Sequence, residues 1–463
     1  MSAHEDINAN VHLHVLMHGL WGTTNHLESA ARVFSARHGN SSQKLGGGSA
    51  SDSQDSGLLD ASEHVQLLPV TVNQGTKTYD GIDWGAERAA KEILEAVHQI
   101  EKESKQIRVT KFSITGYSLG GLYARYVIAI LHATGFFVNI QPLNFVTIAT
   151  PHLGMPRVHT LFGRISRSLG RFMLGNTGRQ LFALDDWGGT GRPWLEVAAD
   201  KGSVFWKALN AFKRIDIYAN AVNDLMVPYV TGAFEDNEQF TKMIAQIQVE
   251  FEPGYEPVLK SWSVLDQSPP KNLSFKEHIE SWKPQPFLGP FIQWNFPYNV
   301  ILMGILPITL SMVSLSLPFV YLSSSRASRR RVSVLQKEMH AEESFIERMK
   351  SFTASIGEQI EEVAEDVVEQ TLPLSGCSSA EANTKTLTQA PGSSKSKIRV
   401  ELSPSQRKMA RNLNQLANLQ KHLVWIHPTR NSHAAIICRE ELQIPGHKVG
   451  RGVLEHWTDH FAL

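Results

Sequence analysis

Residues 108–132 read RVTKFSITGYSLGGLYARYVIAILH, and this stretch decides the fold. Its first part, 108–115, is rich in β-forming residues, and its last part, 122–132, is an apolar helix pattern. Between them, Ser118 has a glycine two residues before it and a glycine two residues after it. This pattern is typical of a sharp strand-to-helix turn that exposes a serine hydroxyl. Ser118 is therefore predicted to be a nucleophile; the alternative is a glycine-rich turn in an ordinary βα unit.

Strands and helices alternate along the rest of the chain. Apolar runs predict further strands at 11–17, 65–70, 143–149, 214–221 and 422–427. Helical spacing predicts helices at about 25–37, 80–103, 403–421 and 450–460. This order predicts a mostly parallel sheet covered by helices on both faces.

A second motif follows the first strand, where His18-Gly19-Leu20-Trp21-Gly22 occurs. When a carbonyl carbon is attacked, its oxygen becomes negative, and backbone N–H groups that already point at it stabilise that charge. In folds with a serine turn of this kind, such donors come from the residue after the serine and from a loop after an early strand. Leu119 and Leu20 are accordingly predicted as donors of an oxyanion hole; the alternative for Leu20 is a simple strand-ending turn.

The acid and the base must follow Ser118 in that order. Asp224 is the predicted acid, because it lies just past the strand at 214–221, where ligand groups gather on a parallel sheet. Other carboxylates considered are Asp185, Asp186 and Asp216. His433 is the predicted base, because it follows the strand ending near His427, which is the reserve candidate. The remaining C-terminal histidines are His422, His447, His456 and His460, the last two on a helix with apolar partners.

Composition bounds the partners. The chain has 45 lysines and arginines against 45 aspartates and glutamates, so no net charge draws it to nucleic acid. Cys377 and Cys438 are the two cysteines and do not make a disulfide framework. His12 and His14 share one face of a strand as metal ligands would, but no acidic residue follows at matching spacing; no metal or cofactor is predicted. The polar, acidic start is not typical of a secretory signal, so a reducing, cytosol-facing location is expected.

The charge distribution divides the chain. Residues 1–283 are predicted to form the first part of the catalytic domain, with a polar insertion at 40–63, and 401–463 its last part. Residues 284–325 contain no charged residue and are about twice as long as one helical membrane pass. The run begins at Pro284 and is interrupted by Pro286, Pro290, Pro297, Pro307 and Pro318, and four arginines within 326–331 follow it. A charged helical segment is expected at 326–371 and a Ser/Thr/Pro-rich linker at 372–400.

These motifs together resemble a fungal and plant family of serine esterases related to the yeast lipid-droplet phospholipase. The matching pieces are 18–22, 116–121, 150–154, 223–228 and 432–437, within about 11–224 and from 422 onward. The resemblance implies an α/β-hydrolase fold, a Ser118–Asp224–His433 triad, and hydrolysis of acyl esters of phospholipids or other glycerolipids. It also implies residence on lipid droplets or the neighbouring endoplasmic reticulum membrane. The polar insertion and the long spacer before His433 depart from the simplest pattern.

The triad constrains the apolar segment. Ser118 and Asp224 precede it and His433 follows it, so a single crossing would separate them across the bilayer. A hairpin or a monotopic segment is therefore expected, with the domain facing the cytosol. The alternatives are a buried helix or a lid on a soluble esterase or thioesterase, and a non-catalytic membrane scaffold on a degenerate hydrolase fold.

Overall fold

The computed structural model describes residues 9–39, 64–103, 107–158, 174–240, 244–265, 319, 322–333, 400–429 and 431–463. The predicted polar insertion, almost all of the charge-free segment, the charged segment beyond 333 and the linker up to 399 lie outside these residues. Within the described ranges, no helix is long and apolar enough to cross a membrane.

The centre of the molecule is a parallel sheet of six strands, in the order β10-β6-β4-β3-β1-β2. Its strands are β1 (Ala9–Met17), β2 (His64–Pro69), β3 (Ile107–Tyr117), β4 (Gln141–Ile148), β6 (Arg214–Asn220) and β10 (Leu419–Val424). Two short antiparallel pairs are separate from it, β5 (Arg157–Val158) with β9 (Val400–Glu401), and β7 (Ile247–Phe251) with β8 (Leu259–Val264).

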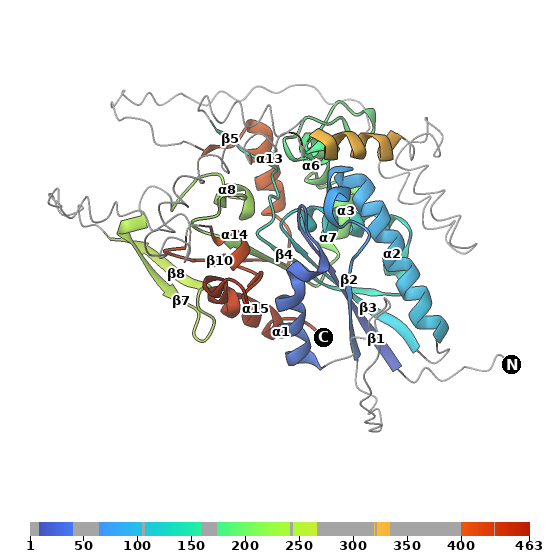
Figure 1. Ribbon diagram of the computed structural model, residues 1–463, viewed down its shortest axis with the longest axis horizontal. Helices are drawn as coiled ribbons and strands as arrows, with labels where there is room; N and C mark the ends of the chain where they lie inside the picture. The colour runs from blue at the N-terminus through green and yellow to red at the C-terminus, as the bar shows by residue number, and fades with distance from the viewer. Residues whose placement is uncertain are drawn as a thin grey trace, which may run out of the picture.

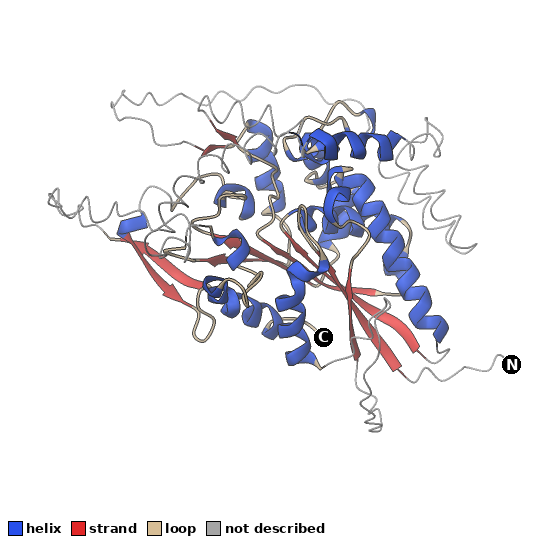
Figure 2. Cartoon of the chain, in the orientation of Figure 1, coloured by secondary structure: helices blue, strands red, loops and turns tan. Residues whose placement is uncertain are grey.

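Helices cover both faces of the sheet (Figures 1 and 2). One face carries α2 (Ile82–Glu103), α3 (Leu119–Ala133), α7 (Val204–Asn210) and α13 (Pro404–Leu413), and the other carries α1 (Glu28–His38) and α15 (Arg451–Asp459). Each face has its own hydrophobic cluster, because alternate strand residues point to opposite sides. The shorter helices are α5 (Gly175–Leu181), α6 (Trp194–Ala198), α8 (Tyr229–Gly232) and α14 (Ser432–Ala435). The predicted parallel sheet flanked by helices is confirmed.

Three local predictions differ from the structure. The polar helix expected over 403–421 ends at Leu413, and the following strand is Leu419–Val424 rather than 422–427. The strand lies at the edge of the sheet and is only half-buried, so its sequence lacks the apolar pattern by which a strand is predicted. Its pairing with β6 determines its conformation. His433 lies in the short helix α14 rather than in an open loop.

His12 and His14 are buried residues of β1, within the six-stranded sheet. His12 Nε2 is 2.7 Å from Ser113 Oγ and His14 Nε2 is 2.9 Å from Thr115 Oγ1, both on β3. These contacts give both histidines a structural role, because their rings connect two neighbouring strands.

Candidate active site

Ser118 stands at the turn between β3 and α3, as the glycine pattern predicted. Its backbone has φ +56° and ψ −124°, a conformation that residues other than glycine rarely adopt. The turn is possible because the flanking positions have no side chain: a Cβ on Gly116 would lie 2.4 Å from the Cα of Gly121, and a Cβ on Gly120 would lie 2.2 Å from the Met17 carbonyl oxygen. The strained backbone and the close packing of strand on helix are those of the nucleophile turn in α/β-hydrolase folds.

His433 and Asp224 meet Ser118 from two other segments. His433 Nε2 lies 3.0 Å from Ser118 Oγ, and His433 Nδ1 lies 2.9 Å from Asp224 Oδ2. The Asp224 side chain is 2% exposed and that of His433 is 9% exposed. Because a carboxylate only accepts hydrogen bonds, the imidazole proton is on Nδ1, and Nε2 is left to accept from the serine hydroxyl. The structure thus brings all three predicted triad residues together in hydrogen-bonding order.

Asp224 is fixed by groups that the sequence analysis did not single out. Its Oδ2 accepts a hydrogen bond from Asn220 Nδ2 at 2.8 Å, and its Oδ1 accepts from the backbone N–H groups of Met226 and Val227 at 2.9 and 2.7 Å. With His433, four donors converge on one carboxylate. Asn220 is the last residue of β6, so its place at the carboxyl end of a strand was the signal that could have identified it.

The segment that carries His433 is anchored on both sides. Ser432 donates its hydroxyl to the carbonyl of Val222 at 2.8 Å, next to the acid. Tyr117 donates its hydroxyl to the carbonyl of His433 at 2.9 Å, so the residue before the serine also holds the histidine backbone. Burial raises the pKa of Tyr117, which keeps its hydroxyl a donor at neutral pH. Hydrogen bonds therefore hold both the ring and the main chain of His433.

The loop after β1 lies directly against Ser118. A Cβ on Gly19 would be 2.9 Å from Ser118 Cβ and 3.3 Å from its Oγ, so only glycine allows this approach. Leu20 follows in the loop, and Leu119 is the first residue of α3, where backbone N–H groups have no partner within the helix. The two predicted oxyanion donors thus belong to the two segments that flank the serine. Trp21, the next residue, has φ +53°.

The other candidates of the sequence have different partners. Asp216 pairs with Arg214 and His422, and Asp185 and Asp186 accept from the backbone of Trp194 and Gly191. The remaining histidines contact groups other than the serine: His427 lies against Asn223, His447 against the Arg439 carbonyl, His456 against the Tyr218 hydroxyl, and His460 against the His456 carbonyl. Within the described ranges, no group of three or more His, Cys, Asp and Glu side chains is placed to hold a metal ion.

Comparison with known proteins places this site in a family. The model of the family "Putative serine esterase (DUF676)" matches residues 8–239, half of the chain, which include Ser118 and Asp224. A protein from Schizosaccharomyces pombe named putative lipase C4A8.10 is 28% identical over 236 residues, 48% of this chain and 29% of that protein. Putative lipase ROG1 of Saccharomyces cerevisiae is 30% identical over 203 residues, 43% of this chain and 27% of that protein.

The chain thus matches less than a third of the length of these curated relatives. Among solved structures, a putative cell surface hydrolase of Lactobacillus plantarum matches over 48% of this chain and 75% of its own, with 15% identity and a TM-score of 0.26. The match of the family model over half of the sequence determines the assignment: the chain belongs to the DUF676 family of serine esterases.

Proposed function

We propose that this protein hydrolyses acyl ester bonds of lipids, with Ser118 as nucleophile, His433 as general base and Asp224 as the residue that orients the imidazole. The single observation that carries the proposal is the continuous hydrogen-bonded line from Ser118 Oγ through His433 to Asp224. A serine hydroxyl is a weak nucleophile on its own, and this arrangement supplies the base that removes its proton.

The proposed reaction uses these groups in turn. Ser118 Oγ attacks the ester carbonyl carbon while its proton moves to His433 Nε2, and the backbone N–H groups of Leu20 and Leu119 stabilise the negative oxygen of the tetrahedral intermediate. Collapse of the intermediate breaks the bond to the alcohol, which leaves with the proton from His433. Water, deprotonated by the same imidazole, then attacks the acyl-serine; the acid is released and the serine hydroxyl is restored. No cofactor takes part in these steps.

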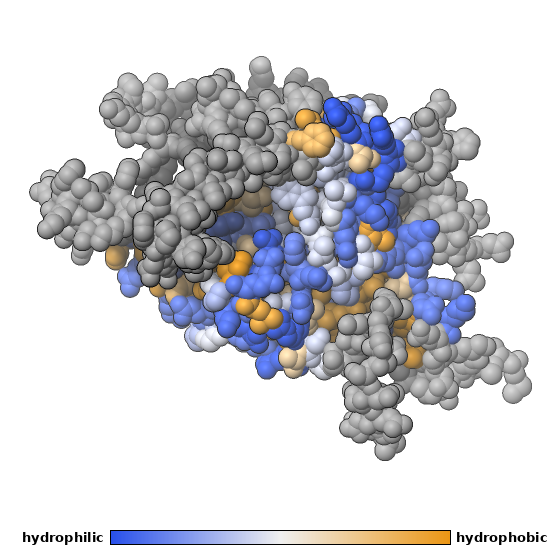
Figure 3. Space-filling view, viewed as in Figure 1, coloured by the Kyte–Doolittle hydropathy of each residue, from blue (hydrophilic) through white to orange (hydrophobic). Residues whose placement is uncertain are grey.

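Phospholipids or other glycerolipids are the proposed substrates, at a lipid-droplet or endoplasmic reticulum surface with the catalytic domain on the cytosolic side. The support is the charge-free sequence 284–325, which is unlike ordinary loop sequence, and the exposure of Phe319 and Leu322 near its end, 71% and 44%. Figure 3 shows an orange, hydrophobic area beside blue, hydrophilic surface in the region where Figure 1 draws the helix at 322–333. The yeast relatives are named putative lipases, which agrees with an ester substrate.

The proposal is tested by the variant Ser118→Ala. We expect it to lose at least about 10³-fold in hydrolysis of both p-nitrophenyl butyrate and a glycerolipid in vesicles, because the nucleophile is absent. A fluorophosphonate probe should label the wild-type protein and not the variant. The matched control is Ser261→Ala, which removes an exposed hydroxyl on β8 that contacts Glu250 and should leave both readouts unchanged. Hydrolysis retained by Ser118→Ala would refute the assignment, and a wild-type protein that neither labels nor hydrolyses would favour the scaffold alternative.

A further inference from the structure

A helix over residues 322–333 begins in the last residues of the charge-free sequence and packs against the catalytic domain (the gold helix in Figure 1). One of its faces is buried: Ser325, Ser328 and Val332 are 2%, 1% and 4% exposed, at the spacing of one helical side. Ser328 lies close to the start of α5, where a Cβ on Gly175 would be 3.4 Å from its Oγ. The helix is therefore docked on the domain along a defined face.

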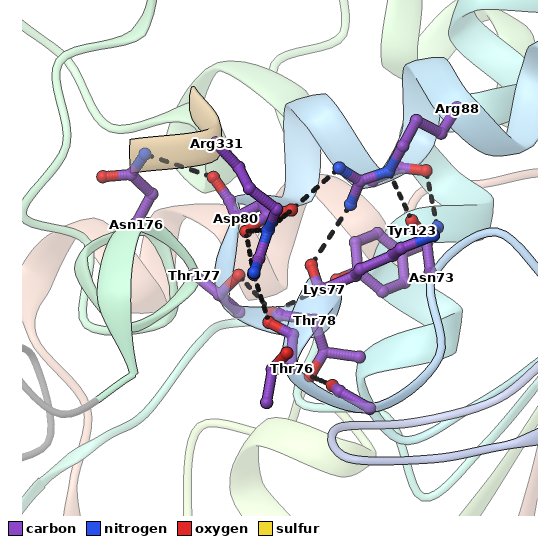
Figure 4. A network of polar contacts seen from close by, with 12 residues as sticks. Asn73, Thr76, Lys77, Thr78, Asp80, Arg88, Tyr123, Asn176, Thr177 and Arg331 are labelled. Atoms are coloured by element: carbon purple, nitrogen blue, oxygen red, sulfur yellow. Dashed lines mark hydrogen bonds and ion pairs between the residues drawn. The ribbon is translucent and has the colours of Figure 1, made fainter. Parts of the chain in front are cut away.

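Arg331 anchors this helix through an ion pair with the buried carboxylate of Asp80 (Figure 4). Its Nη2 is 2.8 Å from Asp80 Oδ1, and its Nε is 3.2 Å from the same oxygen. Arg88 of α2 reaches the other oxygen, with Nη1 2.8 Å from Asp80 Oδ2. The Asp80 carboxylate is fully buried, and a buried carboxylate is tolerated only when it is paired and hydrogen-bonded. Arg331 and Arg88 together meet this requirement.

Asp80 directly follows the short 3-10 helix η2 (Gly75–Tyr79), and η2 holds the loop that carries Leu20. Thr78 Oγ1 accepts a hydrogen bond from the Trp21 backbone N–H at 3.2 Å, and the Tyr79 hydroxyl accepts from Trp21 Nε1 at 2.5 Å. Arg331 also contacts η2 itself, because its Nη2 donates to the Thr76 carbonyl at 2.9 Å. A chain of polar contacts thus runs from the docked helix to the neighbour of Leu20.

The backbone of Trp21 explains why such support is needed. At φ +53° a side-chain-bearing residue is strained by about 1–3 kcal/mol, and a strained residue persists only where its surroundings hold it. The two hydrogen bonds that Trp21 donates to η2 hold it in this conformation. Its conformation in turn sets the direction of the chain at Leu20, next to Ser118.

We propose that Arg331 is a positioning residue for the oxyanion loop, acting through Asp80 and η2 on Trp21. By this link the docking of the 322–333 helix sets the geometry of the loop at 18–22. The role in catalysis rests on the proposed esterase function, whereas the mechanical link from Arg331 to the loop does not. The experiment therefore measures both.

The test compares Arg331→Gln, Arg331→Lys and the control Arg411→Gln, which removes an exposed arginine from α13. Hydrogen–deuterium exchange of the full-length protein reports the loop at 18–22, and p-nitrophenyl butyrate, a soluble ester, reports catalysis without a lipid surface. In Arg331→Gln we expect exchange at Trp21 and Gly22 to rise about tenfold, the effect of losing a hydrogen bond to a charged group. We expect kcat to fall about tenfold at nearly constant KM, less than the 10²–10³-fold cost of removing a donor outright.

Arg331→Lys should fall between the wild type and Arg331→Gln, because lysine keeps the charge but cannot bind Asp80 and the Thr76 carbonyl in one planar fork. Arg411→Gln should match the wild type. Exchange and kcat that stay at wild-type values in Arg331→Gln would overturn the proposal, as would a fall in kcat that follows the loss of folded protein with the loop's exchange unchanged. If the wild-type protein hydrolyses no ester, the proposed function fails, and the exchange measurement alone decides whether Arg331 controls the loop.

Discussion

Replacing Asp224 by asparagine is the sharpest test of the triad, because the structure dictates how the amide must fit. The carboxylate receives four donors: Asn220 and His433 on Oδ2, and the backbone N–H groups of Met226 and Val227 on Oδ1. An amide has only one acceptor oxygen, and its nitrogen is itself a donor. In Asp224→Asn the new group therefore cannot satisfy both sides.

Each orientation of the amide has a definite consequence. If its oxygen faces Met226 and Val227, its NH₂ group faces His433, whose Nδ1 must then accept, so the proton moves to Nε2 and the imidazole cannot take the proton of Ser118. If the amide turns over, two backbone N–H groups lose their acceptor, at a cost of about 1–3 kcal/mol each. The first orientation is favoured, and it fixes the inactive tautomer. The same change in the serine-protease triad costs about 10⁴-fold in kcat, which corresponds to about 5.4 kcal/mol, and we expect a loss of this size here.

The assay is the kcat for p-nitrophenyl butyrate, normalised to folded protein by circular dichroism. The matched control is Asp216→Asn, which breaks another carboxylate–imidazole pair: Asp216 Oδ1 lies 2.7 Å from His422 Nε2, and Arg214 binds the same carboxylate. This control should lower the thermal midpoint and leave kcat per folded molecule unchanged. Retention of more than about a tenth of wild-type kcat by Asp224→Asn would refute the role assigned to Asp224.

Two further predictions concern packing and pH. In Gly120→Ala the added Cβ would lie 2.2 Å from the Met17 carbonyl oxygen, so the end of β1 must move. We expect kcat to fall at least about tenfold and the thermal midpoint to drop. A variant with wild-type kinetics would contradict the tight packing of the turn. Burial lowers the pKa of His12 and His456 to about 3, against 6.5 in an exposed chain. Between these pKa values the unfolded chain binds more protons than the folded chain. The free energy of unfolding should therefore decrease from pH 6.5 to pH 5, by up to about 1.4 kcal/mol per pH unit for each histidine. Urea titrations that give the same free energy of unfolding at both pH values would contradict this.

Features that depend on local sequence were predictable. The turn at Ser118 needs only a β-rich run, two glycines and an apolar helix within 25 residues, and the structure has each of them where the sequence placed it. The spacing of Ala90, Ile93, Leu94, Val97 and Ile100 likewise predicted one apolar face of α2. Four of these residues are in the core, and Leu94 is partly buried against it. In both cases the information lies within one or two turns of the chain.

Other features could not be predicted, because they depend on how separate segments are placed relative to one another. β10 is a strand because β6 offers it a row of hydrogen-bonding groups, and its own sequence continued the polar pattern of the preceding helix. Asn220 became evident as a partner of Asp224 only once the strand end was placed. The pairing of Asp80 with Arg331 joins residues 251 positions apart, and an arginine run is equally compatible with a fully solvated face. For these contacts the sequence offers residue types without their partners.

The route of the chain between the acid and the base limits what the intervening sequence can do. Before the charge-free sequence, the chain is fixed to the end of β10: Val258 forms a bridge with Val424, and the Pro257 carbonyl accepts a hydrogen bond from the Trp425 N–H. At the end of the charge-free sequence, the 322–333 helix docks on η2. Further along the chain, β9 pairs with β5 of the same domain. Residues 265 and 400 therefore belong to one body, together with the helix that ends the charge-free sequence. A charge-free segment that entered a lipid surface between these points would have to leave on the side where it entered, because a single crossing would pull His433 away from Ser118.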